Sequence, residues 1–156
     1  MRDGLVPGTA AEVVLTVTDA MTVHFDELGT THPVYATWMM IKHMEEAGRK
    51  VILPFLDAGE DAVGYAVDVV HLAPTAVGAR VRARAVLERV EGRRIHCRVE
   101  AYNEREKIGE GRSIQVVLTR DRLEARFRAI GARARRTRVP GSRRRPREGE
   151  GGPHVD

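Results

Sequence analysis

Four segments in the middle of the chain have patterns typical of β-strands, and hydrophobic and polar residues alternate clearly in the second and third. The segments are GYAVDVVHL, ARVRARAVLERV, RRIHCRVEAYNE and KIGEGRSIQVVLTR, and they fall between residues 64 and 120. Every other residue is apolar from Val81 to Leu87, and again from Ile95 to Ala101. Because neighbouring side chains of a strand point to opposite faces, this pattern predicts a β-sheet with one face on a core and the other in water.

Short polar segments separate these predicted strands. Glu91 and Gly92 predict a hairpin turn between the second and third, and residues 103–107 predict a turn between the third and fourth. The four strands are therefore expected to follow one another as an antiparallel meander. A further strand is predicted over residues 11–18, where AEVVLTVT is rich in β-branched residues.

Between Pro33 and Arg49 the apolar residues follow a helical period instead. Pro33 suits a first helical turn, and Gly48 lies close to the predicted end. VILPFLDAGEDA then predicts a short continuation that breaks at Pro54. At 100° per residue the centre of the apolar stripe holds Thr37, Ile41, Met44 and Gly48, with Glu45 at its edge, and the opposite side holds Lys42, His43, Glu46 and Arg49.

One strand, one long helix and four further strands predict an α+β fold, in which a curved antiparallel sheet covers a single central helix. The length of 156 residues and the hydrophobic content of 42% fit one domain, which we assign to residues 1–128. The edge strands of such a sheet remain open. We therefore expect two copies to pair edge to edge as a homodimer, with higher oligomers as a further option.

Positive charge is concentrated at the C-terminal end of the chain. The net charge is +4, but residues 120–156 contain twelve Arg and five acidic residues, so this segment carries +7 and the rest carries −3. Residues 129–156 contain few large apolar side chains, which predicts a disordered, Arg-rich tail. Arg runs can bind nucleic acid, but no aromatic residue follows Phe127 and no nucleic-acid motif is present, so a solvated tail is the favoured interpretation.

The sequence predicts a cytoplasmic protein without a membrane segment. No run of eighteen apolar residues occurs, and the N-terminal residues lack the order of a secretory signal. The single cysteine, Cys97, has no partner for a disulfide or a zinc site, so we expect a buried, small apolar residue and no metal.

Three polar residues lie on or beside the predicted apolar faces. Glu45 either extends into water or lines a cavity. Thr37 either packs with its hydroxyl bonded to the preceding turn or points, with Glu45, to the junction of helix and sheet. His71 is in step with Val69, Val67 and Tyr65, so it points toward the helix as a core histidine or as a catalyst. A nucleophile, a base and an orienting acid at one junction are what acyl transfer requires.

Gly64 begins the same strand as His71. Without a side chain, its backbone N–H can approach a substrate carbonyl closely.

Three stretches of the chain resemble the hotdog-fold thioesterases of the fluoroacetyl-coenzyme A thioesterase type. They are VYATWMMIKHMEEAG, LPFLDAGEDAVGYAVDVVHLAPTAVGARVRARA and VEGRRIHCRVEAYNEREKIGEG, and the resemblance covers about residues 5–118. Its most specific elements are Ala-Thr with Met-Glu seven and eight residues beyond Thr37, and Gly-x6-His with a turn of small residues after His71. The resemblance implies a long helix wrapped by an antiparallel sheet, with active sites at the interface of two protomers.

The resemblance also implies the roles of the candidate residues. Thr37, Glu45 and His71 would be catalytic, and the N–H of Gly64 would polarise the thioester carbonyl. Either Thr37 or a water held by Glu45 would attack, while His71 would take a proton and return it to the departing thiolate. No cofactor is implied beyond the coenzyme A of the substrate. The segment VHFDELGTTHPVY is shorter than the aromatic lid region of the fluoroacetyl-specific enzymes, so selectivity for fluoroacetate does not follow.

The first hypothesis is an acyl-coenzyme A thioesterase that hydrolyses a small or medium acyl-coenzyme A to the free acid and coenzyme A. Arg80, Arg93 or Arg94 could contact the nucleotide phosphates, although a solvated strand face explains these residues equally well. The alternative is a non-catalytic module that binds acyl-coenzyme A or regulates in response to it. Association with nucleic acid through the tail ranks last.

Overall fold

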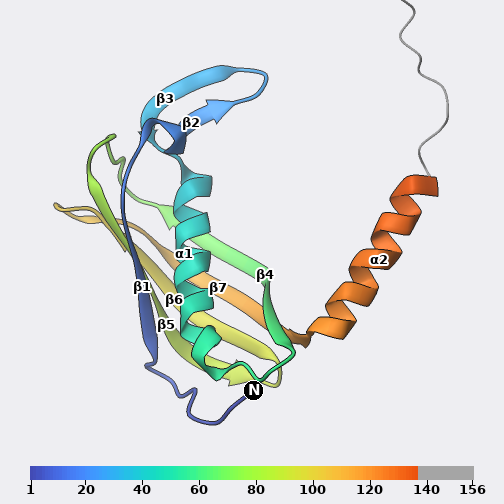
Figure 1. The fold of residues 1–156 in the computed structure, drawn as a ribbon. Coiled ribbons are helices and arrows are strands. Elements are labelled where there is room, and N and C mark those ends of the chain that lie inside the picture. The colour runs from blue at the N-terminus through green and yellow to red at the C-terminus, as the bar shows by residue number, and fades with distance from the viewer. Residues whose placement is uncertain (137–156) are drawn as a thin grey trace, which may run out of the picture. The chain divides into compact units, whose positions relative to one another are not determined.

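The computed structural model describes residues 1–136. Residues 1–123 form one compact unit, and the second unit begins at Glu124. The elements are β1 (Ala10–Thr16), η1 (Asp19–Met21), β2 (Thr22–Phe25), β3 (Gly29–Tyr35), α1 (Thr37–Ile52), η2 (Leu53–Phe55), β4 (Glu60–His71), β5 (Arg80–Glu91), β6 (Arg94–Tyr102), β7 (Lys107–Thr119) and α2 (Arg120–Arg136) (Figure 1).

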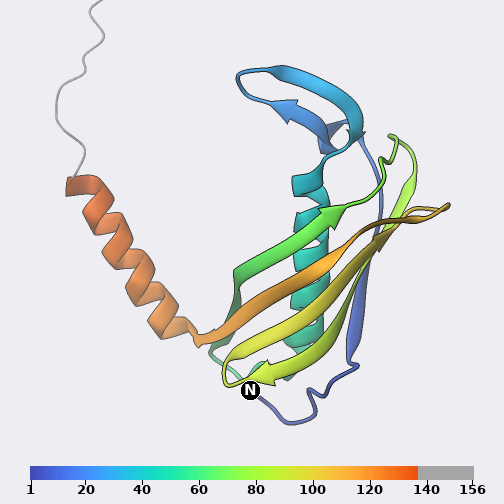
Figure 2. The same cartoon turned by 180° about the vertical axis from the view of Figure 1, so that it is seen from behind.

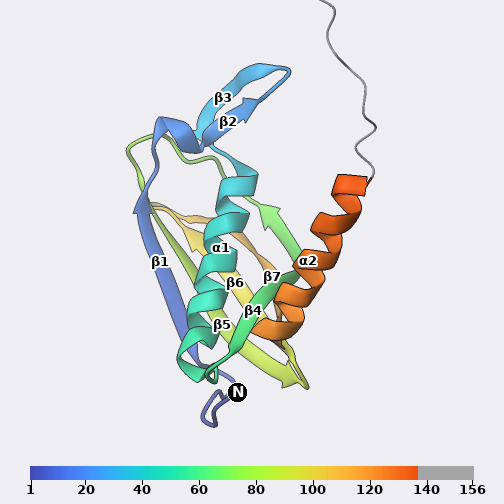
Figure 3. The same ribbon diagram turned by 45° about the vertical axis from the view of Figure 1, so that its right-hand side comes forward.

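Five antiparallel strands form a sheet in the order β1-β5-β6-β7-β4, and the long helix α1 lies against one face of it (Figures 1 and 3). The curved sheet around one central helix is the hotdog arrangement, which confirms the predicted fold class. Seen from behind, the strands cross the length of the helix side by side (Figure 2).

The order of the strands differs from the predicted meander. The short turns keep β5, β6 and β7 as neighbours, but β4 pairs with β7 and not with β5. The connection from His71 to Arg80 is eight residues long and contains Pro74, so it can carry the chain from one side of the sheet to the other. As a result β4 is an edge strand.

The predicted alternation of buried and exposed residues is confirmed on the central strands. Their inward side chains are at most 2% exposed and meet the apolar residues of α1. Cys97 is among them, and burial raises the pKa of its thiol to about 11. The buried side chains are Val81, Ala83, Ala85 and Leu87 of β5, Ile95, Cys97, Val99 and Ala101 of β6, and Met40, Met44, Ala47 and Val51 of α1.

The helix begins later than predicted, and its buried face lies at a different angle around the helix axis. It starts at Thr37, and Pro33 lies in β3. His43, predicted to face solvent, is only 6% exposed, because its Nδ1 atom lies 2.6 Å from the buried Tyr35 hydroxyl. A polar partner within the protein makes burial of this imidazole tolerable, which periodicity alone cannot reveal.

The polar segment before the helix contains a hairpin that the sequence did not predict. Strands β2 and β3 pair with irregular register, and Gly29 turns between them with a φ of 72°. The ring of Phe25 packs against Trp38 of α1 with a centroid distance of 5.4 Å. This contact places an aromatic pair directly beside the start of the helix.

Helix α2 includes residues 129–136, which the sequence assigned to the tail. Residues 137–156, the remainder of that segment, lie outside the described residues. Within residues 1–136 the structure contains no helix that is long and apolar enough to span a membrane.

We predict that Gly111→Ala lowers the free energy of unfolding by about 1–3 kcal/mol, because an added Cβ would overpack the pair of strands β4 and β7. The Cβ would lie 2.7 Å from the Val69 Cα, and backbone cannot move aside as cheaply as a side chain. Urea denaturation measures the change.

Gly131→Ala is the control for this substitution. Gly131 lies in α2 with nothing within 4 Å of its Cβ position, so alanine should leave stability unchanged or raise it slightly. Equal stability of Gly111→Ala and the unmodified protein would contradict the described packing of β4 on β7.

Candidate active site

Thr37 and His71 meet where the first turn of α1 faces the end of β4. Their Oγ1 and Nδ1 atoms are 2.9 Å apart. The chain before the helix is fixed by backbone hydrogen bonds from Tyr35 N to Thr75 O at 2.8 Å and from Ala36 N to Met21 O at 2.9 Å. The structure therefore brings two of the predicted site residues into direct contact.

The surroundings of His71 favour its neutral form. Burial lowers the pKa of the imidazole, and the backbone of Ala73 opposes this shift less strongly. Its Nε2 atom is buried and has no hydrogen-bond partner among the described residues. When Nδ1 carries no proton, it accepts the hydrogen bond of the Thr37 hydroxyl, which is the geometry of a general base on its nucleophile.

Glu45 and Gly64 form a second contact between α1 and β4. A Cβ at Gly64 would collide with Oε1 of Glu45 and would lie 3.2 Å from Cδ, so the missing side chain makes room for the carboxylate. Glu45 is exposed at its position on the helix, as expected for a residue at the edge of the buried face. Glu45 thus reaches water and also lines a cavity, so both interpretations of this residue describe part of what the structure shows.

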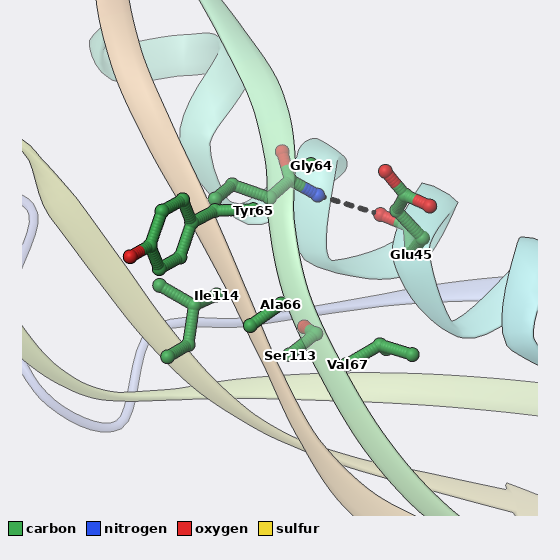
Figure 4. Close-up of a pocket in the computed structure, with 8 residues that line it drawn as sticks. Glu45, Gly64, Tyr65, Ala66, Val67, Ser113 and Ile114 are labelled. Atoms are coloured by element: carbon green, nitrogen blue, oxygen red, sulfur yellow. Dashed lines mark hydrogen bonds between the residues drawn. The ribbon is translucent and has the colours of Figure 1, made fainter.

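A β-bulge in β4 changes the face on which Tyr65 lies. Gly64 pairs with Gln115 and Ala66 pairs with Ile114, so Tyr65 is the extra residue. Counting in twos from His71 predicted Tyr65 on the helix side. That prediction was wrong: the ring contacts Arg94 on the other side of the sheet, and Glu45 and Tyr65 lie on opposite sides of β4 (Figure 4).

Gln115 and Ser113 are residues of this region that the sequence analysis missed. Both are 3% exposed on β7. Nε2 of Gln115 donates a hydrogen bond of 2.9 Å to the carbonyl oxygen of Glu45, drawn as the dashed line in Figure 4. Two polar residues at strand positions that should face the core were the signal that could have identified them.

A cavity of about 300 Å³ lies around the contact between Glu45 and Gly64. It reaches both sides of the edge strand, since its lining includes Gln115 on the helix side and Tyr65 on the other. The full lining is Glu45, Gly64, Tyr65, Ala66, Val67, Ser113, Ile114 and Gln115 (Figure 4).

The four candidate residues form two separate pairs within one chain. Thr37 and Glu45 are eight residues apart, which is about 12 Å along a helix. Gly64 and His71 are seven residues apart, which is roughly 23 Å along a strand. One chain therefore holds a Thr–His pair at one end of β4 and a Glu–Gly pair near the other.

Other candidate ligands lie apart from these pairs. Arg80 and Arg94 occupy opposite ends of the β5–β6 hairpin, and only Arg94 contacts a residue of the cavity. Arg93 donates a long hydrogen bond of 3.4 Å to the Val117 carbonyl. Among residues 1–136 no group of three or more His, Cys, Asp or Glu side chains is arranged to hold a metal ion.

Comparison with known proteins identifies the family. The family of fluoroacetyl-CoA-specific thioesterases matches residues 17–121. A fluoroacetyl-CoA thioesterase of Streptantibioticus cattleyicolor is 37% identical over 95 residues, which is 61% of this chain and 68% of that protein.

Solved structures agree with this assignment. A Thermus thermophilus protein described as a thioesterase superfamily member is 49% identical with a TM-score of 0.84, over 86% of this chain and 98% of the other. The fluoroacetyl-CoA thioesterase FlK is 32% identical with a TM-score of 0.77, over 81% of this chain and 98% of the other. The chain therefore belongs to the fluoroacetyl-CoA-specific thioesterase family of hotdog proteins and is a thioester hydrolase.

Proposed function

We propose that the protein hydrolyses a small or medium acyl-coenzyme A to the free acid and coenzyme A, using Thr37, Glu45 and His71. The observation that carries the proposal is the 2.9 Å contact between the Thr37 hydroxyl and an imidazole whose pKa is lowered by burial. The relatives named as fluoroacetyl-CoA thioesterases support a short acyl group, and fluoroacetyl-CoA is among the substrates to be tested.

The chemistry requires a nucleophile, a base and a group that polarises the carbonyl. The Thr37 hydroxyl, or a water held by Glu45, attacks the thioester carbon as its proton passes to Nδ1 of His71. The backbone N–H of Gly64 stabilises the negative charge that develops on the carbonyl oxygen. The C–S bond then breaks, and His71 returns the proton to the thiolate.

If Thr37 itself attacks, the first product is an acyl ester on its Oγ1. A water must then hydrolyse this ester: His71 accepts a proton from the water and returns it to Oγ1 of Thr37 as the bond between the acyl carbon and Oγ1 breaks. If a water attacks directly, the acid is released in one step and Thr37 only orients the imidazole. Both routes use the same residues and give the same products.

A second copy of the chain would complete the site. Strand β4 is an edge strand whose apolar side chains are unusually exposed, with Tyr65 at 60%, Val67 at 41% and Val70 at 58%. Such an edge can pair with its own copy in antiparallel fashion about a two-fold axis. An axis centred between Val67 and Asp68 would bring Gly64 of one copy opposite His71 of the other. The Thr–His pair of one protomer would then face the Glu–Gly pair of its partner.

The alternative function is a module that binds acyl-coenzyme A without turning it over. It requires the same cavity and the same fold. Binding of coenzyme A esters without any release of thiol would favour it over the hydrolase.

Replacing Thr37, Glu45 or His71 by Ala should each lower turnover by roughly a hundredfold or more, because each removes a group that attacks, holds the attacking water, or takes or positions the transferred proton. Thiol release from acetyl-, fluoroacetyl-, butyryl- and hexanoyl-coenzyme A measures the effect and ranks the acyl groups. Glu46→Ala is the matched control, since Glu46 is an exposed neighbour of Glu45 on the helix. A His71→Ala protein with unchanged turnover would remove His71 from the mechanism.

The rate should depend on pH through the imidazole of His71. A general base must be neutral, and burial lowers the pKa of this group from its ordinary value of 6.5. We therefore expect kcat/KM to rise with pH through a midpoint below 6.5 and to be flat from there to about pH 8. A midpoint above 6.5 in a pH–rate profile would argue against this assignment.

Mixing two inactive variants should restore activity if the site is shared between protomers. In a mixture of Thr37→Ala and Glu45→Ala chains, half of the dimers are mixed, and each mixed dimer has one intact site. Recovery of about a quarter of the unmodified turnover is therefore expected after subunit exchange. A mixture that stays as inactive as its components would show that each chain forms its site alone.

A further inference from the structure

The side-chain amide of Gln115 is buried at the cavity beside Glu45, and only one of its two polar atoms has a partner. Gln115 is 3% exposed. Its Nε2 atom donates a hydrogen bond of 2.9 Å to the carbonyl oxygen of Glu45, and because a carbonyl oxygen can only accept, the orientation of the amide is fixed. The other atom, Oε1, is buried and has no hydrogen-bond partner within residues 1–136. A buried acceptor of this kind normally has a partner, so Oε1 is available to a donor that enters the cavity.

This acceptor lies beside the pair of Glu45 and Gly64. Gln115 is the register partner of Gly64 across β4 and β7. Side chains of residues paired in this way have Cβ atoms about 5 Å apart. The Glu45 carboxylate occupies the place of the missing Gly64 side chain (Figure 4), so the amide of Gln115 is its neighbour on the helix side of the sheet.

The size of the cavity decides which end of a thioester can lie next to Gln115. In the proposed reaction the thioester carbonyl lies at the N–H of Gly64, and the acyl group and the sulfur leave the carbonyl carbon in different directions. Coenzyme A is too large for a cavity of about 300 Å³, so its arm has to lead outward to solvent. A short acyl group is the end that can be enclosed beside a buried side chain. Oε1 of Gln115 is therefore expected to face the acyl group.

We propose that the protein prefers small acyl groups that carry a hydroxyl on the carbon next to the thioester carbonyl, and that Gln115 selects them. The hydroxyl donates its hydrogen to Oε1. A neutral donor suits this site, because an ammonium group would lose more hydration than one amide oxygen can replace. An acyl group without a donor leaves Oε1 buried and unsatisfied, which is how a polar pocket rejects such an analogue. The inference rests on the proposed hydrolysis of acyl-coenzyme A and names its substrate class.

Glycolyl-coenzyme A is the simplest ester of this class. It differs from fluoroacetyl-coenzyme A, the ester in the names of the relatives, only in carrying a hydroxyl in place of the fluorine. Both substituents are small and polar, but fluorine has no hydrogen to donate. Comparing these two esters with acetyl-coenzyme A therefore separates hydrogen-bond donation from size and polarity.

Gln115→Met tests the selection, because methionine has a similar size and lacks the amide oxygen. Thiol release by the full-length protein gives kcat/KM for the acetyl, fluoroacetyl and glycolyl esters. The ratio of glycolyl to acetyl should fall by about tenfold or more in Gln115→Met, since Oε1 no longer accepts from the hydroxyl. The ratio of fluoroacetyl to acetyl should stay the same. Comparing each ratio between the two proteins cancels the reactivity of the esters and any general effect of losing the hydrogen bond to the Glu45 carbonyl.

Val117→Ala is the matched control. Val117 is 1% exposed and lies two positions after Gln115 on the same face of β7, but it does not line the cavity. This variant loosens the packing of the strand without removing an acceptor, so both ratios should equal those of the unmodified protein.

Three results would overturn the inference. They are an unchanged ratio of glycolyl to acetyl in Gln115→Met, an equal fall in the ratio of fluoroacetyl to acetyl, which would indicate recognition of polarity alone, and an equal fall in Val117→Ala. If the unmodified protein releases no thiol from any ester, the proposed hydrolase activity is rejected, and calorimetric titration with the intact esters gives the test instead. Tighter binding of glycolyl- than acetyl-coenzyme A that is lost in Gln115→Met would then support this site, and equal binding would overturn it.

Discussion

The close approach of helix α1 to strands β4 and β7 is the constraint on which the rest of the structure depends. Three positions along this contact lack a side chain. A Cβ at Gly48 would lie 3.3 Å from Oγ of Ser113, one at Gly109 would lie 2.5 Å from Sδ of Met40, and one at Gly64 would meet the Glu45 carboxylate. Because interiors are packed to high density, larger residues here would push the helix away from the strands. The distance between helix and strands thus also sets the distance between the candidate catalytic groups.

This constraint explains why the polar residues lie at the border of the core and not inside it. Met40, Met44 and Ala47 are fully buried and supply the stabilising apolar contact, while Thr37 and Glu45 lie on the side of the helix that faces the edge strand. An ionised carboxylate within the core would lose its hydration at a large cost. At the border it keeps access to water and still reaches the strand.

Much of the fold could be predicted from the sequence because apolar and polar residues alternate regularly in two of the strands. The alternation from Val81 to Leu87 and from Ile95 to Ala101 determined both the strands and their buried faces. The pairing of β4 with β7 could not be predicted, since a long connection does not reveal which edge it reaches. The β2–β3 hairpin was missed because its strands are short and polar, and the buried position of His43 was missed because it depends on a hydrogen bond from a residue eight positions away.

The candidate site was predicted in its parts but not in its arrangement. The contact between Thr37 and His71 agrees with the expectation that both side chains point to the junction of helix and sheet, although the predicted start of the helix was wrong. The proximity of Glu45 to Gly64 was not predicted. Gln115 was missed, because a single polar residue on a strand does not reveal that it will donate a hydrogen bond to a helix carbonyl 70 residues away. The separation into two pairs could not be read from local patterns, because it depends on how far a helix and a strand each extend over a similar number of residues.

The bulge at Tyr65 gives the spacing between Gly64 and His71 a geometric meaning. In a regular strand, residues separated by an odd number of positions point to opposite faces, so a glycine and a histidine seven apart could not both face the helix. One extra residue restores the common face. When two residues of one strand must both face the helix, an odd number of positions between them requires one irregularity in the strand.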